Sequence, residues 1–144
     1  MAKIRYFLAK TEPAVYSIHD LSRDGRTTWD GVRNAQARQA MQTMRPGDFV
    51  FIYHSGGVSA VVGLAKVASE PMEDPSAEKS TIIDFEFVHG LDEPVSLKAI
   101  KESGQFAEFA LVRQSRLSTM EAPATFANWM KKQRPELKLY LKAS

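Results

Sequence analysis

The chain contains no cysteine, and features that mark several other protein classes are missing as well. Without cysteine the protein has no disulfide, no thiolate metal site and no cysteine nucleophile. No apolar run approaches the roughly 18 residues that a membrane-spanning helix needs. The first residues also lack the apolar stretch of a secretory signal. These absences predict a soluble protein of a reducing, cytoplasmic compartment with no membrane partner.

Motifs of the common catalytic and metal sites are also absent. The three histidines, His19, His54 and His89, do not have the spacing of a metal-binding pair. There is no nucleophile elbow, no Walker loop and no dinucleotide-binding glycine motif. A hairpin turn explains Gly56-Gly57 better than a phosphate-binding loop does. We therefore expect a binding protein with no catalytic residue, no metal and no cofactor.

The net charge is small, at +2, but it is distributed unevenly along the sequence. Basic residues outnumber acidic ones in 1–45 and in 109–144, whereas acidic residues dominate 46–108. If the two basic ends meet in space, they form a basic face that attracts phosphates. The alternative is an ordinary solvated surface, and charge alone leaves both interpretations open.

The chain has the length of one domain, spanning residues 1–144. Apolar runs and alternation predict strands at about 5–9, 49–53, 61–67 and 83–87. Capping residues and helical spacing predict helices after Ser17, Asn34, Ser96 and Pro123, and a short helix from Pro135. Residues 70–80 are expected to form a surface loop, and residues 109–120 to be extended or irregular. This order predicts an α+β fold whose mixed or antiparallel sheet is curled into a barrel, with helices outside.

Two polar segments in the first third of the chain are candidate ligand sites. Lys10-Thr11-Glu12-Pro13 ends the first strand, where it forms either a polar rim or a solvated turn. The segment from Trp29 to Asn34 offers a stacking face, a basic group and a helix N-terminus with unpaired N–H donors. The alternative for this segment is that Trp29 belongs to the core and Asn34 only caps a helix.

Two further candidates lie later in the chain. Tyr53-His54-Ser55 stands where a buried strand emerges into a glycine turn, so it is either a ligand site or the shoulder of a hairpin. Arg113 and Arg116 belong to a segment, 111–118, that we expect to be extended and suited to phosphate contact. The alternative for them is an edge strand with solvated arginines.

Taken together, these segments resemble one family, the EVE domain, in their order and approximate spacing. The resemblance covers the chain from about Tyr6 to Trp129, and its most specific block lies between Trp29 and Arg38. It implies a PUA-like fold, a curled barrel of mixed strands with peripheral helices, related to the YTH and ASCH domains that handle RNA. It also implies recognition of a modified base in DNA or RNA, with the base held in a pocket. The segments are Lys10-Thr11-Glu12-Pro13, Trp29-Asp30-Gly31-Val32-Arg33-Asn34 with Gln36-Ala37-Arg38, Gly47-Asp48, Tyr53-His54-Ser55, and Leu111-Val112-Arg113-Gln114 with Arg116-Leu117-Ser118.

The resemblance assigns a role to each candidate residue. Trp29 would be one wall of the base pocket, through stacking worth roughly 1–3 kcal/mol. The residues expected to bond base edges are Asn34, Tyr53, His54 and Ser55. Those expected to line the mouth and meet phosphates are Lys10, Arg33, Arg113 and Arg116, while Leu117 and Ser118 would close the far side. The remaining predicted ligand-binding residues are Glu12, Gly31 and Val32.

The leading interpretation is a monomeric module that binds a nucleobase, a modified one, within RNA or DNA. Two alternatives stay open. In one, the protein is an enzyme that uses His54, Glu12 and Lys10 for acid–base work on a nucleotide or small molecule. In the other, it is an interaction module that binds a protein or a free small ligand.

Overall fold

A seven-stranded sheet organises the chain, which the computed structural model describes over residues 3–141. The strand order is β2-β6-β4-β3-β1-β7, and β5 pairs with β6 off this path. The pair β1 and β3 is parallel and the other pairs are antiparallel, so the sheet is mixed, as predicted. In chain order the elements are β1 (Tyr6–Thr11), α1 (Ile18–Asp24), β2 (Arg26–Val32), α2 (Ala35–Gln42), β3 (Phe49–His54), β4 (Ala60–Val67), β5 (Met72–Glu73), β6 (Thr81–Ser96), α3 (Leu97–Glu102), α4 (Ala110–Arg113), β7 (Thr119–Ala122), α5 (Ala124–Gln133) and the 3₁₀-helix η1 (Pro135–Leu139).

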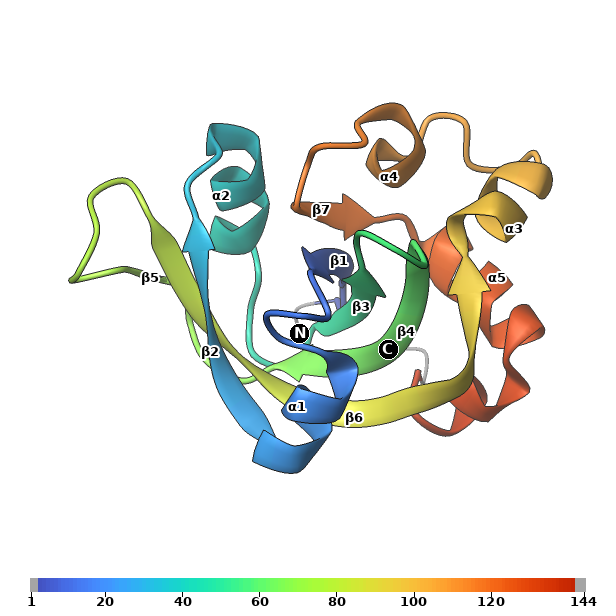
Figure 1. Ribbon diagram of the computed structural model, residues 1–144, viewed down its shortest axis with the longest axis horizontal. Helices are drawn as coiled ribbons and strands as arrows, with labels where there is room; N and C mark the ends of the chain where they lie inside the picture. The colour runs from blue at the N-terminus through green and yellow to red at the C-terminus, as the bar shows by residue number, and fades with distance from the viewer. Residues whose placement is uncertain (1–2, 142–144) are drawn as a thin grey trace.

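The sheet is curled because its ladders are interrupted by register shifts. One shift lies between Ile52 and Tyr53 where β3 meets β4, and two more lie along the β4–β6 ladder. Such bulges bend a strand and increase its twist. Figure 1 shows the long strand β6 curving around the outside of β3 and β4, with α2 on one side and α3 and α5 on the other. The predicted fold class is confirmed, with the sheet forming an open half-barrel whose strand order runs from β2 to β7.

Capping side chains set the helix starts where the sequence predicts them. Ser17 and Asp20 form a capping box at α1, in which each side chain accepts a hydrogen bond from the other residue's backbone N–H. Asn34 Oδ1 accepts from the backbone of Ala37 at α2, and Ser96 Oγ caps α3 in the same way. The helix after Pro123 is also confirmed as α5.

One part of the core lies between the sheet and the C-terminal helices, and another lies under α1 and α2. Strand β3 is buried over its whole apolar run, from Phe49 to Tyr53, as its sequence predicts. Phe51 meets Phe126 of α5 edge to face, with ring centroids 5.3 Å apart. Trp129, on the same helix, packs against Phe106. The prediction that the aromatic residues of the last helix belong to the core is therefore confirmed.

Two segments differ from the sequence-based expectation. Residues 109–120, expected to be extended or irregular, contain the helix α4 and the strand β7. Four residues make too short a helix to leave a periodic pattern, and α4 is held by N–H groups of Val112 and Arg113 that donate to the carbonyl of Phe109. The second difference is β2, which was not expected as a strand because Arg26–Val32 is mostly polar. It forms because its backbone pairs with β6.

Helix α1 lies unusually close to the sheet. A Cβ placed on Gly63 of β4 would lie 2.5 Å from Ile18 Cδ1 and 2.9 Å from the carbonyl oxygen of His89. Ile18 is itself buried, with 6% of its surface exposed. Gly63 is therefore the residue that allows α1 to dock onto β4 at this distance.

We expect Gly63→Ala to lower the free energy of unfolding by roughly 1–3 kcal/mol, the usual cost of overpacking. The measurement is urea unfolding followed by circular dichroism. The matched control is Gly90→Ala, on the neighbouring strand, where the nearest atom to an added Cβ lies 3.7 Å away. Equal stability losses in the two variants would contradict the close docking of α1.

Candidate functional site

A pocket of about 380 Å³ opens between the end of β1, the loop that follows it, and β2. In the sheet order β1 and β2 are separated by β3, β4 and β6, so the curl of the sheet is what brings them to one pocket. Its volume lies within the range of about 300–1,000 Å³ typical of small-molecule sites. We call it the first pocket, and its lining residues are Lys10, Thr11, Val15, Tyr16, Thr27, Thr28, Trp29 and Asp30.

Two aromatic rings form the apolar part of the first pocket. Trp29 and Tyr16 meet nearly at right angles, with ring centroids 6.2 Å apart. Behind Trp29 lies Phe85 of β6, at a centroid distance of 5.0 Å. Trp29 is 9% exposed, so it belongs to the core and to the pocket at once. Most of the Trp29 ring therefore packs in the core, and the small remaining part faces the pocket.

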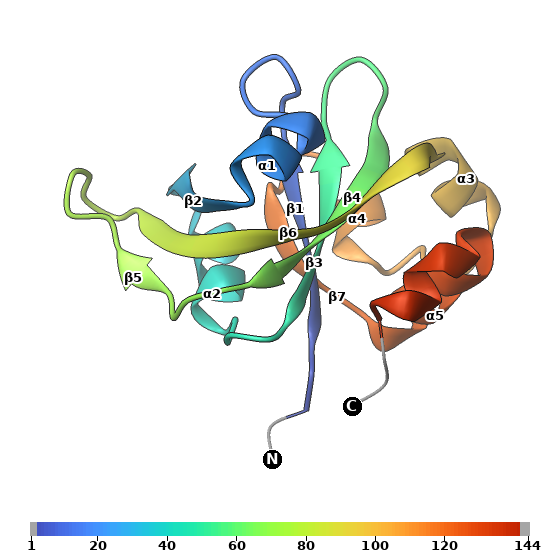
Figure 2. The same ribbon diagram turned by 90° about the horizontal axis from the view of Figure 1, so that it is seen from below.

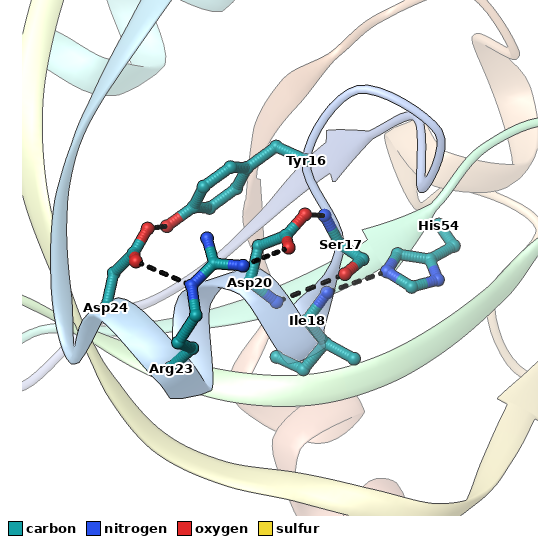
Figure 3. A network of polar contacts seen from close by, with 7 residues as sticks. All are labelled: Tyr16, Ser17, Ile18, Asp20, Arg23, Asp24 and His54. Carbon is teal, nitrogen blue, oxygen red and sulfur yellow. Dashed lines mark hydrogen bonds and ion pairs between the residues drawn. The ribbon is translucent and has the colours of Figure 1, made fainter.

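A polar network fixes Tyr16 at the pocket (Figure 3). The Tyr16 hydroxyl donates to Asp24 Oδ2 at the end of α1, at 2.8 Å. Arg23 pairs with both Asp24 and Asp20, each at 3.1 Å. The hydrogen bond from Arg23 and the one from Tyr16 lower the pKa of Asp24, which keeps its carboxylate charged as the acceptor. Tyr16 is thus tied to both ends of α1, through its position beside Ser17 and through Asp24.

His54 fastens the start of the same helix. Its Nε2 accepts a hydrogen bond from the backbone N–H of Ile18 at 3.0 Å, as Figure 3 shows. This bond needs the neutral imidazole, and burial together with the nearby His19 lowers the pKa of His54. The arrangement therefore favours the protonation state that can accept the bond.

The charged part of the first pocket consists of Lys10 and Asp30. Lys10 Nζ donates to the carbonyl of Ser115 at 2.9 Å and lies 5.6 Å from the centre of the Tyr53 ring. Burial lowers the pKa of Lys10. Asp30 is exposed, and no other residue within 3–141 bonds or pairs with its carboxylate.

A bulge in β2 places Asp30 at the pocket. The pairing of β2 with β6 shifts register between Trp29 and Val32, which leaves Asp30 and Gly31 outside the ladder. Gly31 has φ of 78°, a left-handed conformation that glycine adopts without steric cost. The predicted site residue Gly31 therefore allows the backbone of the bulge to turn, while its neighbour Val32 is buried.

A second pocket, of about 510 Å³, lies on the other side of α1. His54 lines this pocket and not the first, because successive side chains of a strand point to opposite faces. Tyr53 lies beneath Lys10, whereas His54 turns toward α1. The lining residues of the second pocket are Ile18, His19, Ser22, His54, Val58, Val62, Phe87, Gly90, Leu91, Asp92 and Pro94.

The segment from Ser115 to Ser118 lies beside Lys10. Besides the bond from Lys10 Nζ, the backbone N–H of Lys10 donates to the carbonyl of Ser118 at 2.8 Å. Leu117 is buried, Arg116 is exposed, and Arg113 pairs with Glu108 at 3.2 Å. The short helix α4, rather than an extended segment, carries Arg113.

Of the predicted site residues, Lys10 and Trp29 line the first pocket. Glu12 is exposed and its carbonyl accepts from Val15 and Tyr16, while the N–H of Ser55 donates to Thr11. Arg33 is exposed just before Asn34, whose Oδ1 is used as the cap of α2.

Sequence reasoning missed half of the lining of the first pocket. Recognising β2 as a strand would have brought Thr27 and Thr28 forward, since they directly precede Trp29. Tyr16 carries a weaker signal, an aromatic residue directly before a capping serine. Thr11 and Asp30 lie inside the predicted segments without an assigned role, and the lining residues outside every predicted segment are Val15, Tyr16, Thr27 and Thr28.

Two further findings bear on the chemistry. In the part of the chain from 3 to 141, no three His, Cys, Asp or Glu side chains gather in a group that could hold a metal ion. Over the same residues, every helix is too short or too polar to cross a membrane.

Residues 5–133 match the family model described as the EVE domain. Thymocyte nuclear protein 1 of Mus musculus is 32% identical over an alignment 124 positions long, which covers 67% of this chain and 55% of the mouse protein. The Gallus gallus protein of the same name is 30% identical over an alignment 155 positions long, covering 81% and 64%. The chain thus spans little more than half the length of the curated relatives it matches. The family resemblance seen in the motifs is confirmed.

Solved structures have the same fold. A protein from Rhodopseudomonas palustris is similar with a TM-score of 0.86 and 34% identity, over 93% of this chain and 95% of that one. The human THYN1 protein in complex with DNA containing 5-methylcytosine is similar with a TM-score of 0.81 and 25% identity, over 90% and 96%. An ASCH protein from Zymomonas mobilis, at 12% identity and a TM-score of 0.64, shares the fold alone.

The bond from Ile18 to His54 predicts a pH dependence of stability. Because the pKa of His54 is lowered by folding, the unfolded chain takes up a proton near the ordinary value of 6.5 before the folded chain does. The stabilising contribution is complete above pH 6.5 and is lost as the pH falls below that value. We expect His54→Gln, whose side-chain oxygen still accepts the bond, to flatten this part of the profile of unfolding free energy against pH. His19→Gln removes only the smaller of the two causes and should flatten the slope less than His54→Gln does; an unchanged slope in His54→Gln would contradict the assignment.

Proposed function

The chain belongs to the EVE domain family, and from that membership we propose that it binds nucleic acid by holding one nucleobase in the first pocket. The observation that carries the proposal is the pair of rings, Trp29 and Tyr16, beside two polar groups that bear charge, Lys10 and Asp30. A base has a flat apolar face and polar edges, so it matches both parts of this lining. The human THYN1 protein, a structural neighbour, forms a complex with DNA that contains 5-methylcytosine.

Stacking supplies the affinity in this proposal. The base lies against the exposed part of Trp29, with Tyr16 closing the side. An aromatic contact of this kind is worth roughly 1–3 kcal/mol per base and depends little on the identity of the base. Phe85 and Asp24 hold the two rings in place before the ligand arrives, so the rings lose little conformational freedom on binding. Rings that are already fixed lower the entropic cost of binding.

Asp30 supplies the discrimination between bases. A carboxylate accepts hydrogen bonds and donates none, so it favours a base edge with an exocyclic amino group, as in cytosine. Its lack of a partner among residues 3–141 leaves both oxygens open to a ligand. A methyl group on the base would rest against the apolar wall and add about 0.8 kcal/mol. Recognition of a modified base is then a modest preference on top of base binding.

Basic side chains around the pocket complete the proposal by meeting phosphates. Arg116 belongs to the segment that Lys10 contacts, and Arg33 follows β2 directly. Both are exposed, and the charge they add is of the kind that draws a polyanion at low salt. Their role is to hold the strand, since phosphate contacts carry no sequence information of their own.

We propose binding without turnover. Acid–base catalysis by Lys10, Glu12 and His54 would need the three groups in one site. Lys10 lines the first pocket, His54 lines the second, and Glu12 lines neither. The Nε2 of His54 is also engaged by Ile18.

Tyr16→Leu should weaken binding of a single-stranded DNA with one 5-methylcytosine by about tenfold, through lost stacking. Fluorescence anisotropy of the labelled strand at low salt gives the Kd. Tyr140→Leu is the matched control, because this half-buried tyrosine stacks on His89 away from the pocket. Equal affinity of wild type and a folded Tyr16→Leu protein would contradict the proposal. Trp29→Phe should bind within about threefold of wild type because an aromatic stacking face remains.

Asp30→Ala should reduce the preference for cytosine over thymine at the recognised position by about tenfold, with little change in thymine binding. The test compares two strands that differ at that base alone. Asp92→Ala, an exposed carboxylate of the second pocket, is the control. A preference unchanged by Asp30→Ala would show that the base edge is read elsewhere.

A further inference from the structure

Val15 is an apolar side chain held out into solvent at the mouth of the first pocket. It is 76% exposed and lines the pocket beside Tyr16. A valine of this exposure contributes almost no burial to folding. Isolated exposed apolar residues are common and need no explanation by themselves. Val15 differs from such residues because it lies at the rim of the proposed base pocket.

The loop that carries Val15 is fixed by its own hydrogen bonds. The N–H groups of Val15 and Tyr16 both donate to the carbonyl of Glu12, each at 2.9 Å. Thr11 Oγ1 donates to the carbonyl of Tyr16 at 2.7 Å, and Tyr16 is anchored to Asp24. The valine is therefore presented on a turn whose backbone is satisfied on both sides, rather than on a loose loop.

A second exposed valine provides an internal comparison. The parallel strands β1 and β3 end at the same edge of the sheet, so the loops that follow them project together (Figure 2). The loop after β3 carries Val58, which is 71% exposed. Val58 lines the second pocket and not the first. The two residues share type, edge and exposure, and they differ in their relation to the first pocket.

We propose that Val15 is a wedge that enters the base stack of double-stranded DNA and fills the space left by the base held in the first pocket. This inference rests on the proposed function. Extruding a base from a duplex costs a few kcal/mol in lost stacking and pairing. Apolar side chains inserted between base steps are a known means of stabilising such a distorted duplex. A side chain at the pocket rim lies next to the strand position that the base has left.

The wedge makes a prediction that contact with the base alone does not. A single strand has no vacated stack to fill, so Val15 should matter more for duplex DNA than for the same sequence as a single strand. Val15→Thr keeps the shape of the side chain and replaces a methyl group by a hydroxyl, and at this exposure it leaves the fold intact. Val15→Ala shortens the side chain, while Val15→Met lengthens it and keeps its apolar character.

The experiment measures Kd by anisotropy for one sequence with a single 5-methylcytosine, as a duplex and as a single strand. We expect Val15→Thr and Val15→Ala to weaken duplex binding about tenfold more than they weaken single-strand binding. Val15→Met should bind the duplex at least as tightly as wild type. Val58→Thr should change neither affinity. A 2-aminopurine next to the target base should brighten on duplex binding by wild type and less by Val15→Ala.

Two other results separate the wedge from the proposed function. Equal weakening on duplex and single strand, or no weakening on either, overturns the wedge and leaves base binding in place. Failure of the wild type to bind the single strand overturns the proposed function, and the wedge with it.

Discussion

The contact between Ile18 and the backbone of Gly63 fixes helix α1, which lines the second pocket and anchors Tyr16 of the first. Because no β-carbon separates them, α1 lies directly on β4. Its start is then fastened by the capping box and by His54, and its end by Asp24 and Arg23. Tyr16, one residue before the cap, takes its place from these contacts. The apolar contact between α1 and β4 thus fixes the position of Tyr16, an aromatic wall of the first pocket.

The curl of the sheet positions the other aromatic wall of the first pocket, Trp29. Trp29 belongs to β2, at one end of the strand order, and Lys10 belongs to β1, near the other end. A flat sheet would hold these two strands far apart. The register shifts in β3, β4 and β6 bend the sheet until both face one pocket. Irregularities that weaken the ladders locally are therefore what creates the concave site.

Much of the fold follows from local sequence signals. Ser17, Asn34 and Ser96 are polar residues before helical patterns, and each caps its helix in the structure. The continuous apolar run of β3 likewise predicts a buried strand, and the structure confirms it. Strand β2 was missed because its pairing with β6 is non-local and its residues are mostly polar. The helix α4 was missed because one turn is too short to produce a period.

The candidate site was less accessible to sequence reasoning. Trp29 and Lys10 stood out as unusual residues at element ends, and both line the first pocket. His54 was predicted in the same site because Tyr53-His54-Ser55 ends a buried strand and resembles a family motif, but it lines the second pocket. Alternation along a strand sends neighbours to opposite faces, and which face meets the pocket depends on how the sheet curls. Val15 and Asp30 gain their meaning only from the loop and the bulge that present them.

Strand β1 bears on the order in which the molecule can form. It pairs with β3 on one side and with β7 on the other, and Arg5 beside it forms a two-bonded pair with Glu121, 116 residues away. A ribosome has therefore released almost the whole domain before β1 finds its last neighbour. Until then one edge of β1 offers unpaired backbone groups to any other strand. Non-local closure of this kind slows folding, so the interval between synthesis and closure is when the chain is most exposed to association with copies of itself.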